Sequence, residues 1–362
     1  MKIEDRADIG RELGRMGLCM ERYSRREFIL KLVGAIGALY LSSGCLYPKS
    51  EVRARRRIAE GGIEAPHPTP ELTPNDEFYV TNFNGTPSID IEGWSLVVDG
   101  LVERPLTLSY EEITSMTSVS EIVTLECIGN GIGGDLIGNA EWVGVPLKTL
   151  LDRAMVKPSA VDVVLYGEEG YSDSLSIEKA MEGDTILAYK MNGETLPKDH
   201  GYPLRAIVPG IYGMKNVKWL RRIEVVGQDY KGHWEKQGWS DSAVIKLMSR
   251  IDAPRDGDRI SRSPYNVVGI AYGGLNGVSR VEVSTDGGRS WNEAKIKEPL
   301  SEYAWTLWSY PWNPTEEGRH KIMVRATDRD GNVQKKGSVI SRRVYPSGAD
   351  GMHSIDVYVE KT

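Results

Sequence analysis

The sequence predicts two folded parts in series, an α+β domain followed by an all-β sandwich of the immunoglobulin type. Two observations carry this prediction. Between residues 77 and 242, short strands and short helices interleave without the strict alternation of a doubly wound parallel sheet. From residue 243 to residue 362, about seven short strand patterns follow one another with Asp-Gly turns between them, as in immunoglobulin-like sandwiches.

The composition indicates a globular protein with an ordinary core. The chain has 362 residues, of which 40% are hydrophobic and 27% charged, so it is long enough for two domains of usual size. The net charge of -6, from 45 basic and 51 acidic side chains, gives no electrostatic reason to expect a nucleic acid as partner.

Residues 1–47 have the features of an export leader. The run Ser24-Arg25-Arg26-Glu27-Phe28, followed by a short apolar stretch at 32–41, resembles a twin-arginine signal. The stretch is too short to span a bilayer comfortably, and a membrane anchor or an incidental helix is the alternative. Small residues before Cys45 resemble a lipoprotein cleavage box, although Ser42 stands where an aliphatic residue is usual, so lipidation of Cys45 stays open.

The leader predicts a location in the periplasm or at the outer face of the cytoplasmic membrane. Twin-arginine export carries folded proteins, which favours a protein that binds its cofactor before export. Residues 48–76 read as an extended linker. Its basic stretch, 53–57, is either a solvated tether or is attracted to anionic lipid head groups, and His67 is expected to be exposed and without a role.

The first domain is expected to hold short elements in a regular succession. The periodicity and turn residues predict strands at 78–82, 94–100, 161–166, 186–191 and 206–208, a capped helical turn at 108–113, and helices at 145–154 and 177–181. A further strand is expected to end at Cys127 and to lead into a loop rich in glycine. Few side chains in that loop would block the close approach of a large ligand.

Cys127 is the only thiol of the expected folded body, because the other two cysteines, Cys19 and Cys45, lie in the leader. It therefore has no partner for an intramolecular disulfide there. Three readings remain: a small buried apolar residue, a nucleophile that needs a nearby histidine, or a ligand to a soft metal. No Cys-x-x-Cys or His-x-x-x-His spacing accompanies it, so a zinc site is not expected.

A second informative stretch places cations around a short apolar strand. His200 and Arg205 precede the strand, and Lys215 and Lys218 follow the Pro-Gly turn behind it. Cations gathered at strand ends suit a phosphate-bearing ligand. A surface loop with ordinary charges is the alternative.

The sandwich is predicted from its strands and turns. Strands are expected at 265–272, 279–284, 305–310, 318–328 and 354–359, with turns at 286–291 and 330–332. Because no cysteine pair is present, this domain must depend on its apolar core. Such modules usually bind a partner or dimerise.

Several motifs in order along the chain resemble the sulfite oxidase family of molybdenum enzymes. The resemblance runs from about Phe78 to the C-terminus. The motifs are Leu-Glu-Cys127-Ile-Gly-Asn, Trp142-x-Gly-Val-x-Leu, Asp199-His200-Gly-Tyr-Pro-Leu-Arg205, Val217-Lys218-Trp219-Leu and Val283-Ser-x-Asp-Gly-Gly-x-x-Trp291. The resemblance implies a molybdopterin-binding domain at 77–242 and an immunoglobulin-like dimerisation domain at 243–362. The stretch that follows Cys127 is most similar to the exported prokaryotic branch of the family.

The resemblance also implies the site residues. Cys127 would be the thiolate on molybdenum in a molybdenum-molybdopterin cofactor and the catalytic ligand. The remaining positions that match cofactor-binding residues of the family are Tyr79, Val80, Thr81, Asn82, Asp173, His200, Arg205, Asn216, Val217 and Lys218.

The sequence departs from the sulfite-oxidising members at three places. Thr81 replaces one substrate arginine, Gly131 and Ile132 replace an arginine pair, and Trp239 falls where those members have a tyrosine near the metal. An anion such as sulfite needs compensating charge when it loses its water. These differences therefore argue against sulfite as the substrate.

The favoured function is a two-electron oxygen-atom transfer on a small substrate, either a sulfur compound or a sulfoxide. No haem or iron-sulfur motif is present, so electrons are expected to pass to a separate partner. The alternative is a binding module that kept the fold without catalysis. A carbohydrate-binding sandwich is a third reading, which leaves the first domain unexplained.

Overall fold

The structure is a computed structural model, and it describes residues 67–361. The predicted leader, Cys45 and most of the predicted linker lie outside the described residues, so export and lipidation stay predictions. Within the described part of the chain, no helix is both long and apolar enough to cross a membrane. The described residues belong to one compact unit.

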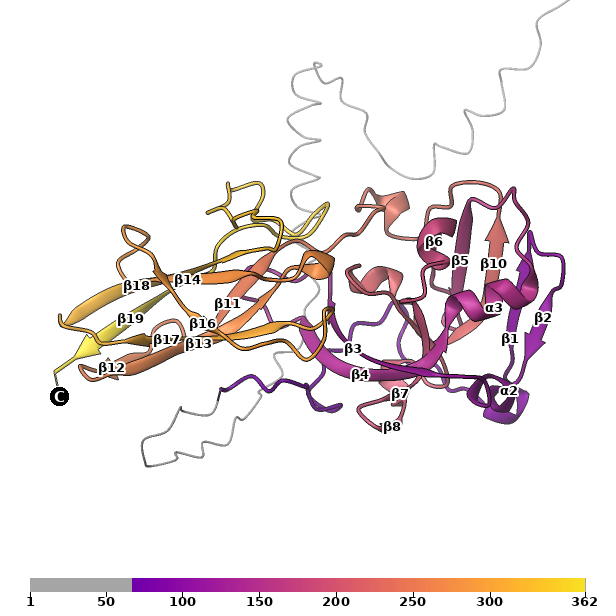
Figure 1. The fold of residues 1–362 in the computed structure, drawn as a ribbon, viewed down its shortest axis with the longest axis horizontal. Helices are drawn as coiled ribbons and strands as arrows, with labels where there is room; N and C mark the ends of the chain where they lie inside the picture. Colours follow the sequence, from indigo (N-terminus) through magenta and orange to yellow (C-terminus); the bar gives the residue numbers. More distant parts are fainter. Residues whose placement is uncertain (1–66, 362) are drawn as a thin grey trace, which may run out of the picture. The chain divides into compact units, whose positions relative to one another are not determined.

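The first sheet of the N-terminal lobe has five strands (Figure 1). In spatial order they are β2 (Leu106–Leu108), β1 (Leu96–Gly100), β10 (Leu220–Val226), β5 (Asp162–Gly167) and β6 (Ser172–Ser176). Only the β1–β10 pair is parallel, and the other pairs are antiparallel. The mixed pairing and the few helices confirm the α+β prediction.

The second sheet of this lobe carries the residues of interest. Its strands are β3 (Val119–Glu126), β4 (Ile137–Pro146), β7 (Ile186–Met191) and β8 (Glu194–Thr195), with β9 (Arg205–Ile207) paired to the other side of β7. Cys127 follows β3 directly, and Arg205 begins β9. One sheet therefore carries both the stretch that contains Cys127 and the stretch that contains Arg205.

Short helices cover the sheets and join the strands. The α-helices are α2 (Tyr110–Thr114), α3 (Leu147–Ala154) and α4 (Ile177–Ala180), and the 3-10 helices are η2 (Ile91–Gly93), η3 (Lys198–His200), η4 (Gly213–Lys215), η5 (Glu235–Gln237) and η6 (Gly274–Asn276). Ser109 and Glu112 form a capping box at the start of α2, as the predicted capped turn requires. Helix α3 buries Leu147, Leu150 and Leu151 against the lobe core.

The C-terminal part is a two-layer sandwich, as predicted. One sheet has the order β11 (Met248–Ala253), β13 (Tyr265–Tyr272), β17 (Thr306–Trp312), β16 (Lys295–Ile296). The other has the order β12 (Arg259–Ser261), β19 (Ser354–Glu360), β18 (Gly318–Thr327), β14 (Arg280–Ser284), β15 (Asn292–Glu293). Their facing side chains, among them Trp308, Ile322 and Val357, form one apolar core.

The sandwich contacts the strand that leads to Cys127. The hydroxyl of Tyr272 donates to the carbonyl of Thr124 at 3.3 Å, and the amide of Trp305 donates to the Thr124 hydroxyl at 2.9 Å. A shared apolar cluster joins Ile128 to Tyr272 and other sandwich residues. The position of β3 is thus fixed from both parts of the chain.

The structure corrects three local predictions. Residues 78–82 do not form a strand, because Phe78 turns into the core against Trp142 while the following residues cross the site without a ladder partner. Strand β4 was not predicted, since its glycines resemble loop residues. Gly138 is required there because a Cβ would lie 2.7 Å from the Phe78 ring. His67 is partly buried, and its ring hydrogen-bonds the carbonyl of Gly269 at 2.9 Å.

Candidate cofactor site

Cys127 lies in a tight turn after β3. The amide of Asn130 donates to the Cys127 carbonyl at 2.8 Å, and the amide of Gly129 points at the sulfur at 3.4 Å. Burial and the neighbouring Glu126 carboxylate raise the pKa of the Cys127 thiol, while the Gly129 amide and the Thr81 hydroxyl act in the opposite direction. Within residues 67–361 no histidine hydrogen-bonds this sulfur. A bound metal cation would supply the charge that a thiolate needs.

The loop behind Cys127 is fixed from the sandwich. Arg250 of β11 donates to the carbonyl of Gly134 at 2.8 Å. At Gly133, which has φ +74°, a Cβ would lie 2.4 Å from Nε2 of His353. Close contact with the second domain thus explains why position 133 of this loop is a glycine.

Arg205 and Lys218 form a cationic cluster beside His200, a buried histidine whose pKa is lowered by burial. Arg205 is buried and donates to the His200 carbonyl at 2.9 Å and the Asn216 carbonyl at 3.3 Å. Lys218 donates to the Asp199 carbonyl at 2.9 Å and to the side chain of Asn82. Neither Arg205 nor Lys218 forms an ion pair with a carboxylate in the described part of the chain.

The pKa values of both cations reflect this lack of counter-charge. Burial lowers the pKa of Arg205 to about 10. Burial and the nearby charge of Arg205 lower the pKa of Lys218 to about 7, although Glu169 and Asp199 act against this. Two desolvated cations without an anion are unfavourable in the free protein and suit a bound phosphate.

The segment 79–82 joins the cysteine to the cations. A Cβ built on Gly213 would lie 3.0 Å from the Tyr79 hydroxyl and 3.8 Å from Cα of Cys127. Gly213 therefore lies between Tyr79 and Cys127. Burial and the negative charge of Cys127 raise the pKa of Tyr79, and Arg205 opposes this shift. Asn82 reaches Lys218, whereas Val80 and Thr81 are exposed.

Asn216 and Val217 act on the local backbone. The side chain of Asn216 accepts from the amide of Val208 at 2.7 Å and donates to the carbonyls of Ile211 and Tyr212, each at 3.2 Å. Val217 is buried in the lobe core. The two side chains therefore shape the loop between β9 and Lys218 rather than face open space, and their contact with a cofactor stays a prediction.

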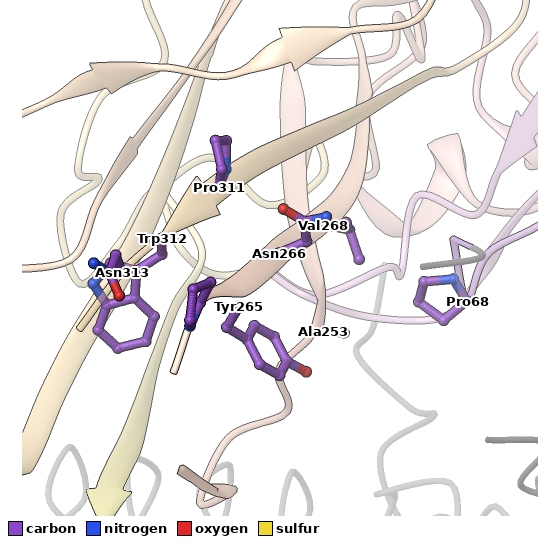
Figure 2. A pocket seen from close by; sticks show the side chains of 9 residues that line it. Pro68, Ala253, Tyr265, Asn266, Val268, Pro311, Trp312 and Asn313 are labelled. Carbon is purple, nitrogen blue, oxygen red and sulfur yellow. The ribbon is translucent and has the colours of Figure 1, made fainter. Parts of the chain in front are cut away.

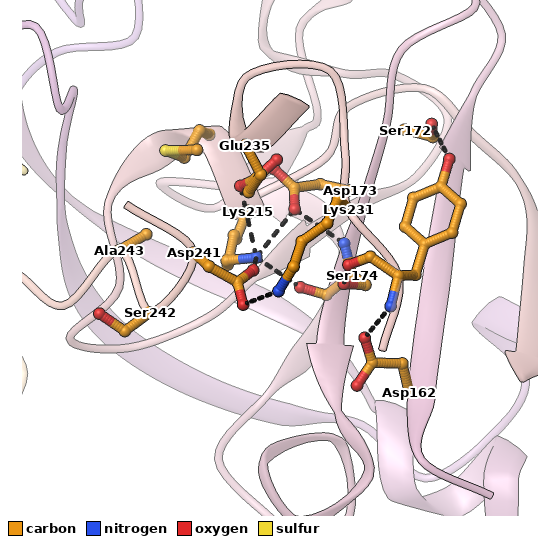
Figure 3. A network of polar contacts seen from close by, with 12 residues as sticks. Asp162, Ser172, Asp173, Ser174, Lys215, Lys231, Glu235, Asp241, Ser242 and Ala243 are labelled. Carbon is orange, nitrogen blue, oxygen red and sulfur yellow. Dashed lines mark hydrogen bonds and ion pairs between the residues drawn. The ribbon is translucent and has the colours of Figure 1, made fainter. Parts of the chain in front are cut away.

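Asp173 is enclosed by protein groups (Figure 3). Its carboxylate accepts from Nζ of Lys215 at 2.9 Å and from the hydroxyl of Tyr171 at 2.9 Å. Lys215 also faces Glu235 and Asp241, each at 3.5 Å. Burial raises the pKa of Asp173, and Lys215 opposes this effect. A direct contact of Asp173 with a cofactor stays a prediction.

Sequence reasoning missed several neighbours of the site. The ring of Phe83 lies 4.6 Å from His233 and 5.5 Å from Tyr171, measured between centroids. Glu126 is buried, bonded to Asn130 at 2.8 Å through one oxygen and without a partner at the other, and burial raises its pKa to about 7. Glu126 could have been predicted as a site residue, because it is an acidic residue directly before the only cysteine of the expected folded body. No feature of the sequence indicates a role for His233.

An apolar pocket lies elsewhere, on the sandwich (Figure 2). It has a volume of about 540 Å³, and its walls include Tyr265, Trp312, Pro264 and Pro311. None of its lining residues belongs to the segments that carry Cys127, His200, Arg205 or Lys218. It is therefore not part of the candidate cofactor site.

Comparison with known proteins identifies the family. Residues 83–234 match the oxidoreductase molybdopterin binding domain, and residues 242–347 match the Mo-co oxidoreductase dimerisation domain. Sulfite oxidase of Arabidopsis thaliana is 30% identical over 324 residues, which cover 73% of this chain and 82% of the plant protein. The chain belongs to the sulfite oxidase family.

Other members of the sulfite oxidase family are similarly distant. Sulfite oxidase of Gallus gallus is 32% identical, with 73% of this chain and 68% of that protein covered. Against the Rattus norvegicus enzyme, the chain spans only 59% of the relative's length. The sulfane dehydrogenase SoxCD of Paracoccus pantotrophus has a similar structure, with a TM-score of 0.72, 27% identity, and coverage of 80% of this chain and 83% of that chain.

The residues of this chain fit the family's molybdenum-molybdopterin cofactor. Cys127 offers one soft, partly exposed sulfur, which suits a transition metal. Arg205 and Lys218 are the cations without a carboxylate that a pterin phosphate would neutralise. The chain is thus a molybdopterin-binding oxidoreductase of this family.

Proposed function

We propose that the protein catalyses a two-electron oxygen-atom transfer on a small sulfur compound or sulfoxide and exchanges electrons with a separate redox partner. The observation that carries the proposal is the grouping of Cys127 with two cations that lack an ion-paired carboxylate, the buried Arg205 and the partly buried Lys218. A protein that no longer bound its cofactor would gain stability by losing that uncompensated charge. The cluster therefore favours a protein that still binds its cofactor, and Cys127 as a metal ligand favours an enzyme among such proteins.

The molybdenum, when bound, supplies a centre that can change by two electrons and carry an oxygen atom. Cys127 would hold the metal, and the Gly129 amide and the Thr81 hydroxyl would hydrogen-bond its sulfur. Arg205 and Lys218 would bind the phosphate. Asn216 would keep the intervening loop in place.

The surroundings of Cys127 favour a substrate without a full negative charge. Thr81, Gly131 and Ile132 stand where sulfite-oxidising members have arginines. Phe83, which directly follows the segment 79–82, adds aromatic surface together with Tyr171 and His233. Desolvating an anion there would lack compensation, whereas a neutral sulfoxide or thioether-like compound needs none. Structural similarity to a sulfane dehydrogenase supports a sulfur compound.

The test measures molybdenum and pterin, the latter by the fluorescence of its oxidised form, in protein exported by its own signal. About one molybdenum per chain is expected for the wild type. Cys127→Ser should remain folded and keep the pterin but show little turnover with any sulfur substrate. Full activity of Cys127→Ser would contradict its role as ligand. Clean wild-type protein without molybdenum, made in a cofactor-competent host, would favour the non-catalytic binding module.

Location and assembly belong to the same proposal. We infer export through the twin-arginine route and assignment to the exported prokaryotic branch, supported by Arg25 and Arg26 and by the stretch after Cys127. Replacing both arginines by lysine should leave the protein in the cytoplasm, as cell fractionation would reveal.

Cys45→Ala tests the lipid anchor by the loss of membrane association. The match to a dimerisation domain suggests a homodimer, which sedimentation would measure.

A further inference from the structure

The loop between β18 and β19 exposes apolar side chains without a partner. We call residues 333–345 the basic loop, which can be followed between these two strands in Figure 1. Val339 and Ile340 at its tip are 79% and 77% exposed, more than any other large apolar residue of the described chain. An exposed aliphatic pair on a loop tip is a frequent feature of binding surfaces.

The basic loop also concentrates positive charge. Its only charged residues are Lys335, Lys336, Arg342 and Arg343, and all four are exposed. No ion pair involving them is found among the described residues. In a chain with a net charge of -6, these four cations form a segment of opposite sign to the protein as a whole.

The basic loop adjoins the candidate cofactor site. The Cβ position of Gly351 lies 2.7 Å from Ile132, in the loop behind Cys127, and 3.3 Å from Arg342. Near the same end, the Tyr345 ring lies 5.2 Å from Trp239, which packs against the apolar cluster that contains Ile128, and the Tyr345 hydroxyl donates to the Gln237 carbonyl at 3.3 Å. The C-terminal end of the basic loop is thus held beside the segment that follows Cys127, while the tip faces solvent.

We propose that the basic loop is the docking surface of the separate redox protein, and that this partner presents an acidic surface around an apolar centre. The inference rests on the proposed function. In the oxidising direction, substrate and water give oxygenated product, two protons and two electrons. The protons pass to solvent, and a one-electron redox protein takes the electrons in two successive encounters. Such encounters use small surfaces with charged rims, where opposite charge speeds association.

A second copy of this chain fits the basic loop less well. If the two-fold axis of such a dimer passed through the loop, eight like charges, four from each copy, would meet there. A membrane with anionic lipids would attract the same cations. The position beside the cofactor site favours a partner that must approach the cofactor.

The experiment compares matched double variants of the full-length, molybdenum-loaded protein. Ile340→Ser with Arg343→Glu changes the basic loop. Ile296→Ser with Lys295→Glu makes the same kind of change on β16, where both side chains are exposed. The probes are an acidic c-type cytochrome and, with opposite charge, a basic c-type cytochrome. Association rate constants are measured at low and high ionic strength.

For the acidic cytochrome at low ionic strength, we expect the loop variant to associate about tenfold more slowly than the wild type. The β16 variant should match the wild type, the difference should vanish at high salt, and the basic cytochrome should bind the wild type no better than the loop variant. Equal rates for both variants, or no binding of the acidic cytochrome to the wild type, would overturn the proposal.

Two further readouts separate rival partners. If the loop variant loses binding only to phosphatidylglycerol vesicles, the surface is a membrane contact. If it turns a dimer into a monomer, the surface is an interface between copies. Either result would overturn the redox-docking assignment. Molybdenum content is measured in the same samples, so wild-type protein without molybdenum refutes the proposed function, whereas loaded protein with unchanged docking refutes this inference alone.

Discussion

Replacing Lys218 by methionine should stabilise the cofactor-free protein and weaken cofactor retention. In the free protein, Lys218 is desolvated beside Arg205, so its pKa falls from 10.5 to about 7. This lowered pKa means that the unfolded chain binds one more proton than the folded chain at intermediate pH. The free energy of unfolding of wild-type apoprotein should therefore rise with pH.

The size of this effect follows from the interval between the two pKa values. The upper limit of the slope is about 1.4 kcal/mol per pH unit. The useful window runs from about pH 8, above which Glu126 and Glu169 are mostly ionised, to about pH 9, where the Cys127 thiol of the unfolded chain is itself about half ionised. Because Lys218 is partly exposed, solvent screening reduces the gain over this window to about 1 kcal/mol.

The assay is urea unfolding of apoprotein made without molybdopterin, at several pH values in this window. Lys218→Met should lack the rise with pH and, near pH 8, should be more stable than the wild type by about 1 kcal/mol, after the loss of its two hydrogen bonds. Its loaded form should release the pterin faster. Lys190→Met, at an exposed lysine of β7, is the control. A destabilised Lys218→Met apoprotein, or an unchanged pH slope, would refute the reasoning.

Three other substitutions test the fold around the site. Lys215→Met should destabilise the protein by about 3 kcal/mol or more in urea unfolding, because Asp173 and Glu235 lose their buried counter-charge. If the free energy of unfolding fell by less than it does for an average surface substitution, the ion pairs of Lys215 would not contribute to stability. Gly138→Ala should cost about 1–3 kcal/mol, since its Cβ meets the Phe78 ring, and thermal unfolding at an unchanged midpoint would contradict this. Ser109→Ala should cost about 1 kcal/mol through the lost cap of α2, with Ser109→Asp expected to restore the midpoint.

The strands that the sequence predicted well are those with continuous β-branched and apolar residues. Strands β7 and β13 have the predicted bounds, because burial on both faces leaves an uninterrupted apolar run. Strand β4 was missed, since Gly138 and Asn139 are strand residues only in contact with Phe78 and Thr124. These contacts join residues that are far apart in the sequence, so the local pattern could not predict the strand.

The same division applies to the candidate site. Cys127 could be found because one cysteine at the end of a strand, followed by glycines, is unusual in any sequence. The buried network around Lys215 could not, because its carboxylates come from positions 173, 235 and 241, with no common spacing. Likewise, nothing local indicates that His353 limits the residue at position 133.

Lys215 and Lys218 illustrate why the fold is needed to assign a ligand-binding cation. They lie three positions apart on one segment and look equivalent in the sequence. Lys215 is neutralised by Asp173, with Glu235 and Asp241 close by, and needs nothing from a ligand. Lys218 has only neutral oxygen partners and lies near a second unpaired cation, Arg205. A phosphate would remove the electrostatic penalty at Lys218 but would be repelled by the carboxylates around Lys215, so we expect affinity for the cofactor phosphate to depend on Lys218.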